Sequence, residues 1–175
     1  MNKRIVAGTV LAQAVLLYAA TAAAQGRINV TGRILDNTCV VSVASQSQTV
    51  RMETEGNKTF FRPGDTGTDN AFSVVLERCG PAAKGVTLGF TGTADALNPA
   101  LVAVPSGAGS ASGLGIGLYE DDGTAIALNG PARKRALQGG ATRVELKYTA
   151  RYVAVSVPVR PGRAAASVTF THTYD

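Results

Sequence analysis

The sequence is poor in the residues that build catalytic and metal centres. It has no tryptophan, two cysteines and a single histidine, His172. One histidine and no CxxC spacing cannot supply the ligands of a transition-metal site. The chain also lacks a serine-nucleophile elbow, so the usual parts of a hydrolase site are missing. We therefore expect a protein that is not an enzyme and binds neither metal nor cofactor.

Charge and long apolar segments are also scarce. Charged residues make up 17% of the chain, and the formal net charge is +5. The basic residues are scattered, which argues against nucleic-acid binding. We interpret the one cluster, Arg133-Lys134-Arg135, as a solvated loop. After the N-terminal stretch no segment is apolar enough to cross a membrane, so no transmembrane segment is expected there.

The N-terminal stretch has the pattern of a secretory signal peptide. A short positive region is followed by the apolar residues 5–20 and then by three alanines suited to signal peptidase. A membrane anchor is the alternative, but the apolar run is short for a span and contains Gln13. We predict a signal peptide over residues 1–24, with cleavage before Gln25.

The two cysteines are predicted to form a disulfide. An even number of cysteines in an exported chain favours a bridge, here Cys39–Cys79. Closing a loop of about 40 residues stabilises a fold by about 4 kcal/mol in the chain-entropy model.

Apolar residues recur with a period of two along most of the remaining chain. This alternation predicts half-buried strands of antiparallel sheets. The alternating runs are 27–35, 72–77, 86–91, 143–152 and 164–174. A further strand is expected over 114–119, after a loop rich in Gly, Ser and Ala.

Turn-forming sequences separate these runs. They fall at residues 62–65, 98–99, 121–123, 129–131, 139–140 and 161–162. Many short strands joined by turns predict an all-β sandwich. The length after residue 24 suits one domain, without an internal repeat or a linker.

Several segments of the chain resemble the pilin subunits of chaperone–usher fimbriae. The first cysteine follows Gly32, Ile34-Leu35 and Asp36-Asn37, and the second closes Phe72-x-Val74-x-Leu76-x-x-Cys79. Further matches are Val86-x-Leu88-x-Phe90-x-Gly92, residues 112–116, Gly162 and the penultimate Tyr174. The resemblance covers nearly the whole chain after the signal peptide.

This resemblance implies an incomplete immunoglobulin-like β-sandwich that lacks its last strand. In the family the gap is an apolar groove, filled first by a periplasmic chaperone and then by the N-terminal segment of the next subunit. That replacement is called donor-strand exchange. We expect a donor-strand segment over 25–35 and a β-sandwich domain over 36–175.

The predicted donor strand presents Ile28, Val30, Gly32 and Ile34 on one face. An incoming strand satisfies open backbone groups and places alternate side chains in pockets. An uncovered groove would expose a sheet edge and an apolar patch, both of which promote aggregation. The alternative is that this segment is the chain's own first strand.

The C-terminal segment is predicted to border the groove and to be recognised by the chaperone. The residues expected to do this are Gly162, Val168, Phe170 and Tyr174. His172 departs from the family, whose members usually carry an apolar residue there. If it faces inward, one end of the groove is more polar than in relatives.

The predicted function is that of a structural fimbrial subunit that supports cell adhesion. Its expected partners are a periplasmic chaperone, an outer-membrane usher and neighbouring pilins, and its location is the fimbrium at the bacterial surface. The segment Gln25 to Thr38 is shorter than in the family's major pilins, which favours a minor adaptor subunit. A major rod pilin and a single-domain fimbrial adhesin are the alternatives.

Overall fold

The structure is a computed structural model that describes residues 29–131 and 133–175. The chain divides into two units, Met1–Arg33 and Ile34–Asp175. Residues 29–33, the described part of the first unit, contain neither helix nor strand. The predicted signal peptide and Ile28 lie outside the described residues.

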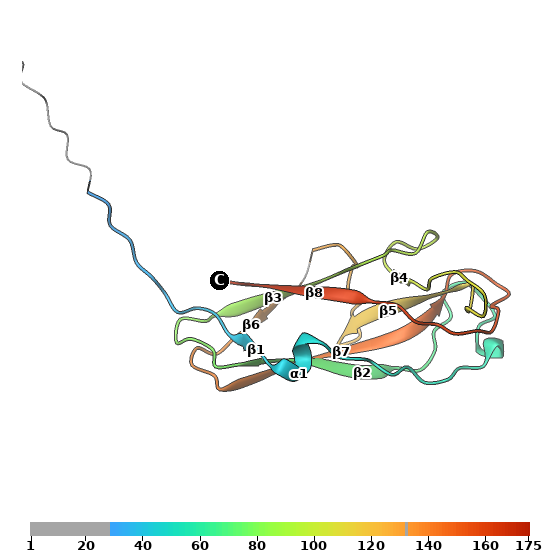
Figure 1. The fold of residues 1–175 in the computed structure, drawn as a ribbon, viewed down its shortest axis with the longest axis horizontal. Helices are drawn as coiled ribbons and strands as arrows, with labels where there is room; N and C mark the ends of the chain where they lie inside the picture. The colour runs from blue at the N-terminus through green and yellow to red at the C-terminus, as the bar shows by residue number, and fades with distance from the viewer. Residues whose placement is uncertain (1–28, 132) are drawn as a thin grey trace, which may run out of the picture. The chain divides into compact units, whose positions relative to one another are not determined.

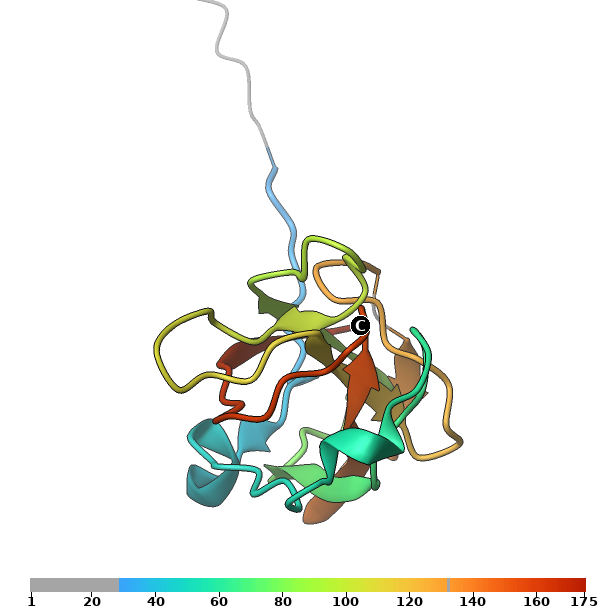
Figure 2. The same cartoon turned by 90° about the vertical axis from the view of Figure 1, so that its right-hand side faces the viewer.

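The second unit consists of two antiparallel sheets (Figure 1). The first sheet has the order β1 (Val40–Val41), β2 (Asn70–Glu77), β7 (Arg143–Ala154), β5 (Leu114–Glu120) and β4 (Val102–Ala103). The second has the order β6 (Lys134–Ala136), β3 (Gly85–Gly92) and β8 (Val168–Tyr174). The helical elements are α1 (Val43–Gln46) and η1 (Asn57–Thr59), which is in the foreground of Figure 2. The predicted all-β class is confirmed.

The core lies between the two sheets and follows the predicted alternation. Val86, Leu88 and Phe90 of β3 are buried, as are Leu146 and Tyr148 of β7. The Phe90 and Tyr148 rings meet edge to face with 5.2 Å between their centroids. Such aromatic pairs add to the stabilisation that comes from burying apolar area.

One long side of the sandwich is closed by charged groups that join the sheets. Arg135 of β6 lies 2.8 Å from an oxygen of Asp121 and 3.4 Å from one of Glu120, at the end of β5. Burial raises the pKa of Glu120, and the nearby Arg135 guanidinium opposes that shift. The interpretation of 133–135 as a solvated loop was wrong, because Lys134–Ala136 pairs with β3 as a strand.

The predicted disulfide is present between Cys39 and Cys79. Cys39 precedes β1, and Cys79 follows the end of β2, with which β1 pairs. The bridge therefore fastens the start of the domain to the second strand. Among the described residues, no helix has the length and apolar character needed to span a bilayer.

Replacing both cysteines by alanine should lower the free energy of unfolding by about 4 kcal/mol, because the sequence separation of 40 residues closes a long loop. Urea unfolding of a soluble form of the subunit would measure this, with the reduced wild-type protein as the control. A free-thiol assay on the denatured, unreduced protein should find no reactive thiol. A loss below about 1 kcal/mol would contradict the expected contribution of the bridge.

Candidate donor-strand groove

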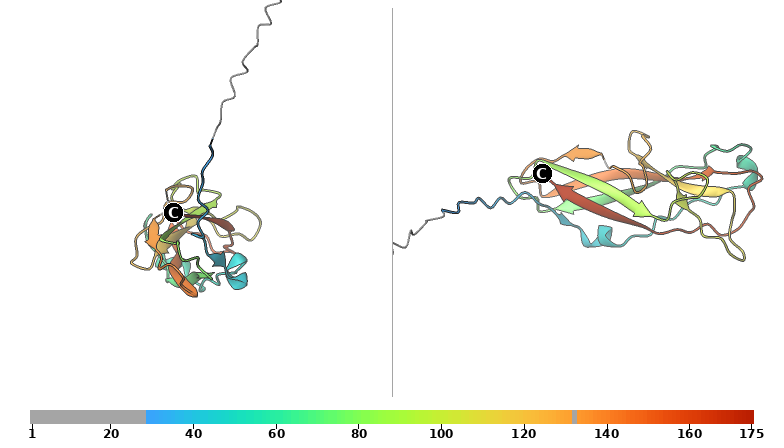
Figure 3. Two further views of the ribbon diagram at one scale, coloured as in Figure 1. Left: turned by 90° about the vertical axis from the view of Figure 1, so that its left-hand side faces the viewer. Right: turned by 90° about the horizontal axis from the view of Figure 1, so that it is seen from above.

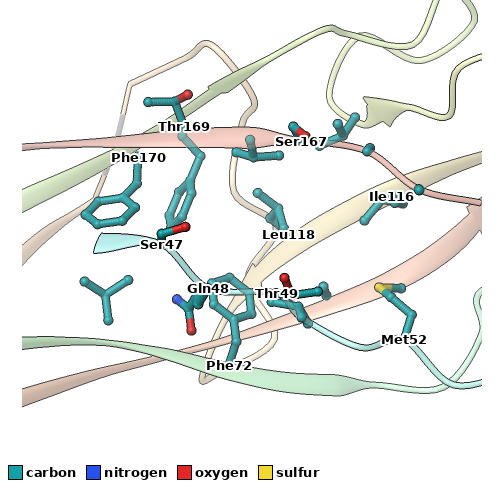
Figure 4. A pocket seen from close by; sticks show the side chains of 18 of the residues that line it. Ser47, Gln48, Thr49, Met52, Phe72, Ile116, Leu118, Ser167, Thr169 and Phe170 are labelled. Atoms are coloured by element: carbon teal, nitrogen blue, oxygen red, sulfur yellow. The ribbon is translucent and has the colours of Figure 1, made fainter. Parts of the chain in front are cut away.

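A long groove of about 1310 Å³ runs along the other side of the domain. One border is β8 with the preceding residues 163–167, and the opposite border is formed mainly by residues 45–52. We call residues 47–52 the wall. Figure 4 shows wall residues facing β8 across the groove, and Figure 3 shows β8 beside β3.

The floor of the groove is the apolar interior of the sandwich. It is formed by inward-facing side chains of five strands: Phe72, Val74, Phe90, Val102, Ile116, Leu118, Ala150 and Tyr152. Phe170 reaches towards this floor from β8, and Phe72 reaches up from β2 (Figure 4). Phe72 stacks on Tyr148 with 5.5 Å between ring centroids, so the floor continues directly into the core.

The border at β8 is an exposed sheet edge. β8 pairs with β3 and is the last strand of its sheet. The register places Phe170 opposite Phe90 and His172 opposite Leu88. Because directly paired residues share a face of the sheet, both side chains lie on the inner face. An edge strand presents open backbone groups to which another strand can pair.

The wall is attached to the first sheet by side chains. Residues 47–52 belong to no strand, and their backbone forms no hydrogen bond with the backbone of any strand. The Gln48 Nε2 group donates to the Ser73 carbonyl at 3.1 Å. Just beyond the wall, the Glu53 backbone N–H donates to Asn70 Oδ1 at 2.8 Å. The wall therefore follows β2 without joining its ladder.

The structure places the predicted groove residues at three different positions. Val168, Phe170 and His172 line the groove. Tyr174 lies beyond its end, where its hydroxyl donates to the Cys39 carbonyl at 3.1 Å. Gly162 lines a separate pocket of about 350 Å³. A Cβ atom at Gly162 would clash with the Ser110–Ala111 backbone, which explains a glycine there.

The described part of the predicted donor strand is open to solvent. Val30 is 89% exposed and Ile34 101% exposed. A Cβ atom at Gly32 would meet no neighbouring atom within 4 Å, so no contact in the described part of the chain requires a glycine there. Residues 29–39 form no strand, and the first strand of the domain is β1. The predicted strand over 27–35 is thus absent from the part of it that the structure describes.

Sequence reasoning missed the wall and its contacts with β2. The segment 42–49 is rich in Ser and Gln and shows no apolar alternation, so it looks like an ordinary loop. Val50 and Met52, two residues apart and both partly buried against the core, were the available signal. The bonds made by Gln48 and Asn70 link distant parts of the chain, and their spacing follows no local pattern.

These features define a class of protein: an all-β subunit whose sandwich lacks a strand along one side. The sequence model described as "Fimbrial protein" matches residues 28–175. The chain therefore belongs to this family, the structural subunits of chaperone–usher fimbriae.

Individual relatives agree with this assignment. The chain is 35% identical to "Probable major fimbrial subunit LpfA" of Escherichia coli O157:H7, covering 100% of this chain and 98% of the relative. It is 33% identical to the solved antigen and type I fimbria protein of Burkholderia pseudomallei, with a TM-score of 0.59 and coverage of 79% and 90%. The P pilus rod subunit PapA has a TM-score of 0.65 at 22% identity, covering 78% of this chain and 99% of PapA, and shows the fold alone.

Phe170→Ala should weaken binding of a strand in the groove, since a buried large side chain contributes about 1.5–3 kcal/mol. The free energy of unfolding of a subunit carrying a donor strand in cis should fall by that amount. Thr171→Ala is the matched control, because Thr171 is the next residue of β8 and does not line the groove. Equal effects of the two substitutions would contradict the placement of Phe170 against the donor.

Proposed function

We propose that this protein is a structural subunit that polymerises by donor-strand exchange. In this proposal, residues 28–34 of one copy or of a related subunit lie in the groove between β8 and the wall. The observation that carries the proposal is the groove itself, which joins an exposed edge strand to an apolar floor. An added strand supplies backbone partners to such an edge and side chains to such a floor.

The dimensions of the donor and the acceptor agree. β8 has seven residues, and an extended segment of that length spans about 23 Å. The segment 28–34 has the same number of residues, with Ile28, Val30, Gly32 and Ile34 on one face. That face is apolar, as is the floor it would cover.

The end at which the chain leaves the domain supports an antiparallel donor. The Gly80 N–H donates to the Thr38 carbonyl at 2.8 Å, and the Ala82 N–H donates to the Asp36 carbonyl at 3.0 Å. This is also the end where β8 stops, next to Cys39. A head-to-tail contact that repeats indefinitely needs the donor to enter at the opposite end. The donor then runs antiparallel to β8, with Ile34 near the start of that strand.

The same exposed groove requires protection before assembly. Open edges and apolar patches pair with other chains during folding. We therefore include a periplasmic chaperone and an outer-membrane usher among the partners, with export guided by a signal peptide over residues 1–24. Val168 and Phe170 would contact the chaperone within the groove, and Gly162 and Tyr174 would shape its two ends. The mature fibre stands at the cell surface, where it supports adhesion.

Two observations bear on the position of the subunit in the fibre. One relative that matches over nearly the full length of both chains carries the name of a major subunit, and this favours a repeating subunit. The short segment from Gln25 to Thr38 favours a minor adaptor between different subunits. We propose the repeating subunit first and the adaptor as the second candidate.

Fusing residues 25–36 after Asp175 through a short flexible linker should give a soluble monomer that is more stable than the unfused domain. A short linker suffices because an antiparallel donor begins where β8 ends. Urea unfolding and size-exclusion chromatography would compare the two proteins. A matched fusion in which Val30 and Ile34 are both replaced by Asp is the control. An unfused domain that is equally stable and monomeric would refute the incomplete fold.

The composition of sheared fimbriae should separate the two candidates for position. Quantitative mass spectrometry should find this chain as the dominant mass of the fibre if it is the repeating subunit. A few copies in each fibre would instead establish the adaptor.

A further inference from the structure

The outer edge of β2 changes partners along its length. At one end it pairs with β1, through Val40 opposite Glu77 and Val41 opposite Leu76. The Ser42 N–H then donates to the Val75 carbonyl at 2.9 Å, and this is the last backbone bond of that ladder. The helix α1 follows immediately at Val43–Gln46. From there the chain continues along β2 as the wall.

Beyond the end of the ladder, hydrogen bonds that involve side chains connect the chain to β2. The Val75 N–H donates to Ser45 Oγ at 2.9 Å. The Ser73 carbonyl accepts from Gln48 Nε2 at 3.1 Å, and Asn70 Oδ1 accepts from the Glu53 N–H at 2.8 Å. As the chain runs from residue 45 through the wall to residue 53, its partners on β2 run back from 75 to 70. The wall thus stays antiparallel to β2 at the distance of one side chain.

Among Ser45, Gln48 and Asn70, the side chain of Asn70 makes the most hydrogen bonds. It is 8% exposed, and its amide nitrogen donates to the Thr68 carbonyl at 2.8 Å and to the Ala150 carbonyl at 3.4 Å. Its oxygen accepts from the Glu53 N–H, so the amide group has partners in β7, in the segment just before β2 and in the chain beyond the wall. A buried amide that bonds through both its nitrogen and its oxygen is held in position.

We propose that Asn70, Gln48 and Ser45 are positioning residues that hold the wall away from β2, so that the groove between the wall and β8 keeps the width that a donor strand needs. This inference rests on the proposed function. If the wall joined the β2 ladder directly, it would lie closer to β2, and the width of the groove between the wall and β8 would change. With side-chain spacers, β2 is satisfied while the wall offers the donor a second edge opposite β8.

The experiment uses the fusion that carries residues 25–36 after Asp175. Amide hydrogen exchange at residues 49–52 reports whether the wall is paired with the donor. Asn70→Ala should speed this exchange by about tenfold, the equivalent of one lost buried hydrogen bond. Gln48→Ala removes a single exposed spacer, is expected to fold, and should speed the same amides by a smaller factor.

The matched control is Asn129→Gly. The Asn129 side chain also makes two bonds to backbone, donating to the Gly92 carbonyl at 2.9 Å and accepting the Gly92 N–H at 3.0 Å. Glycine tolerates the positive φ of 57° at this position. The substitution should destabilise the fold while leaving exchange at 49–52 at the wild-type rate.

The outcomes separate the inference from the function on which it rests. Unchanged exchange at 49–52 in both Asn70→Ala and Gln48→Ala would overturn the positioning role, as would equal acceleration in Asn129→Gly. If the wild-type fusion protects neither 49–52 nor β8 better than the unfused domain, the donor-strand proposal itself fails. If the wild-type fusion protects residues 49–52 and this protection is lost selectively in Asn70→Ala and Gln48→Ala, both the inference and the proposed function are supported.

Discussion

The unpaired edge of β8 is the constraint on which the rest of this structure depends. β8 is the last strand of a three-stranded sheet and has the sandwich interior on its inner face. Sheet edges with open backbone groups pair readily with other chains. In the proposed function, the strand that covers this edge comes from another molecule. The groove, the wall on its opposite border and the exposed apolar residues Val30 and Ile34 support that proposal.

The two long sides of the domain differ: one is closed by ion pairs between the sheets, and the other is open as the groove. On the closed side, Arg135 reaches from β6 to Glu120 and Asp121, so charged groups join the sheets and no strand is needed. On the open side, apolar side chains from both sheets are only partly covered, as at Phe72 and Phe170. The disulfide and the Tyr174–Cys39 hydrogen bond secure the end from which the donor segment departs. The domain is thus cross-linked at the end where its N-terminal segment leaves and open along the groove.

The long strands could be predicted from sequence because their side chains alternate between core and solvent. Expected runs at 72–77, 86–91 and 114–119 correspond to β2, β3 and β5 within two residues at either end. The short strands β1, β4 and β6 carry too few residues to show a period. The wall was missed for another reason: its position is set by Gln48 and Asn70, whose partners are remote in sequence. The segment 29–35, conversely, has a strand's pattern but pairs with no strand in the part of the chain that the structure describes.

Cryo-electron microscopy of assembled fibres would test the central claim most directly. The account predicts that residues 28–34 of one subunit form a strand between β8 and residues 47–52 of its neighbour, antiparallel to β8. The alternate residues Ile28, Val30, Gly32 and Ile34 should face Phe72 and Phe170 across the groove. Density showing the groove filled by the subunit's own N-terminal segment, or subunits joined through another surface, would contradict it.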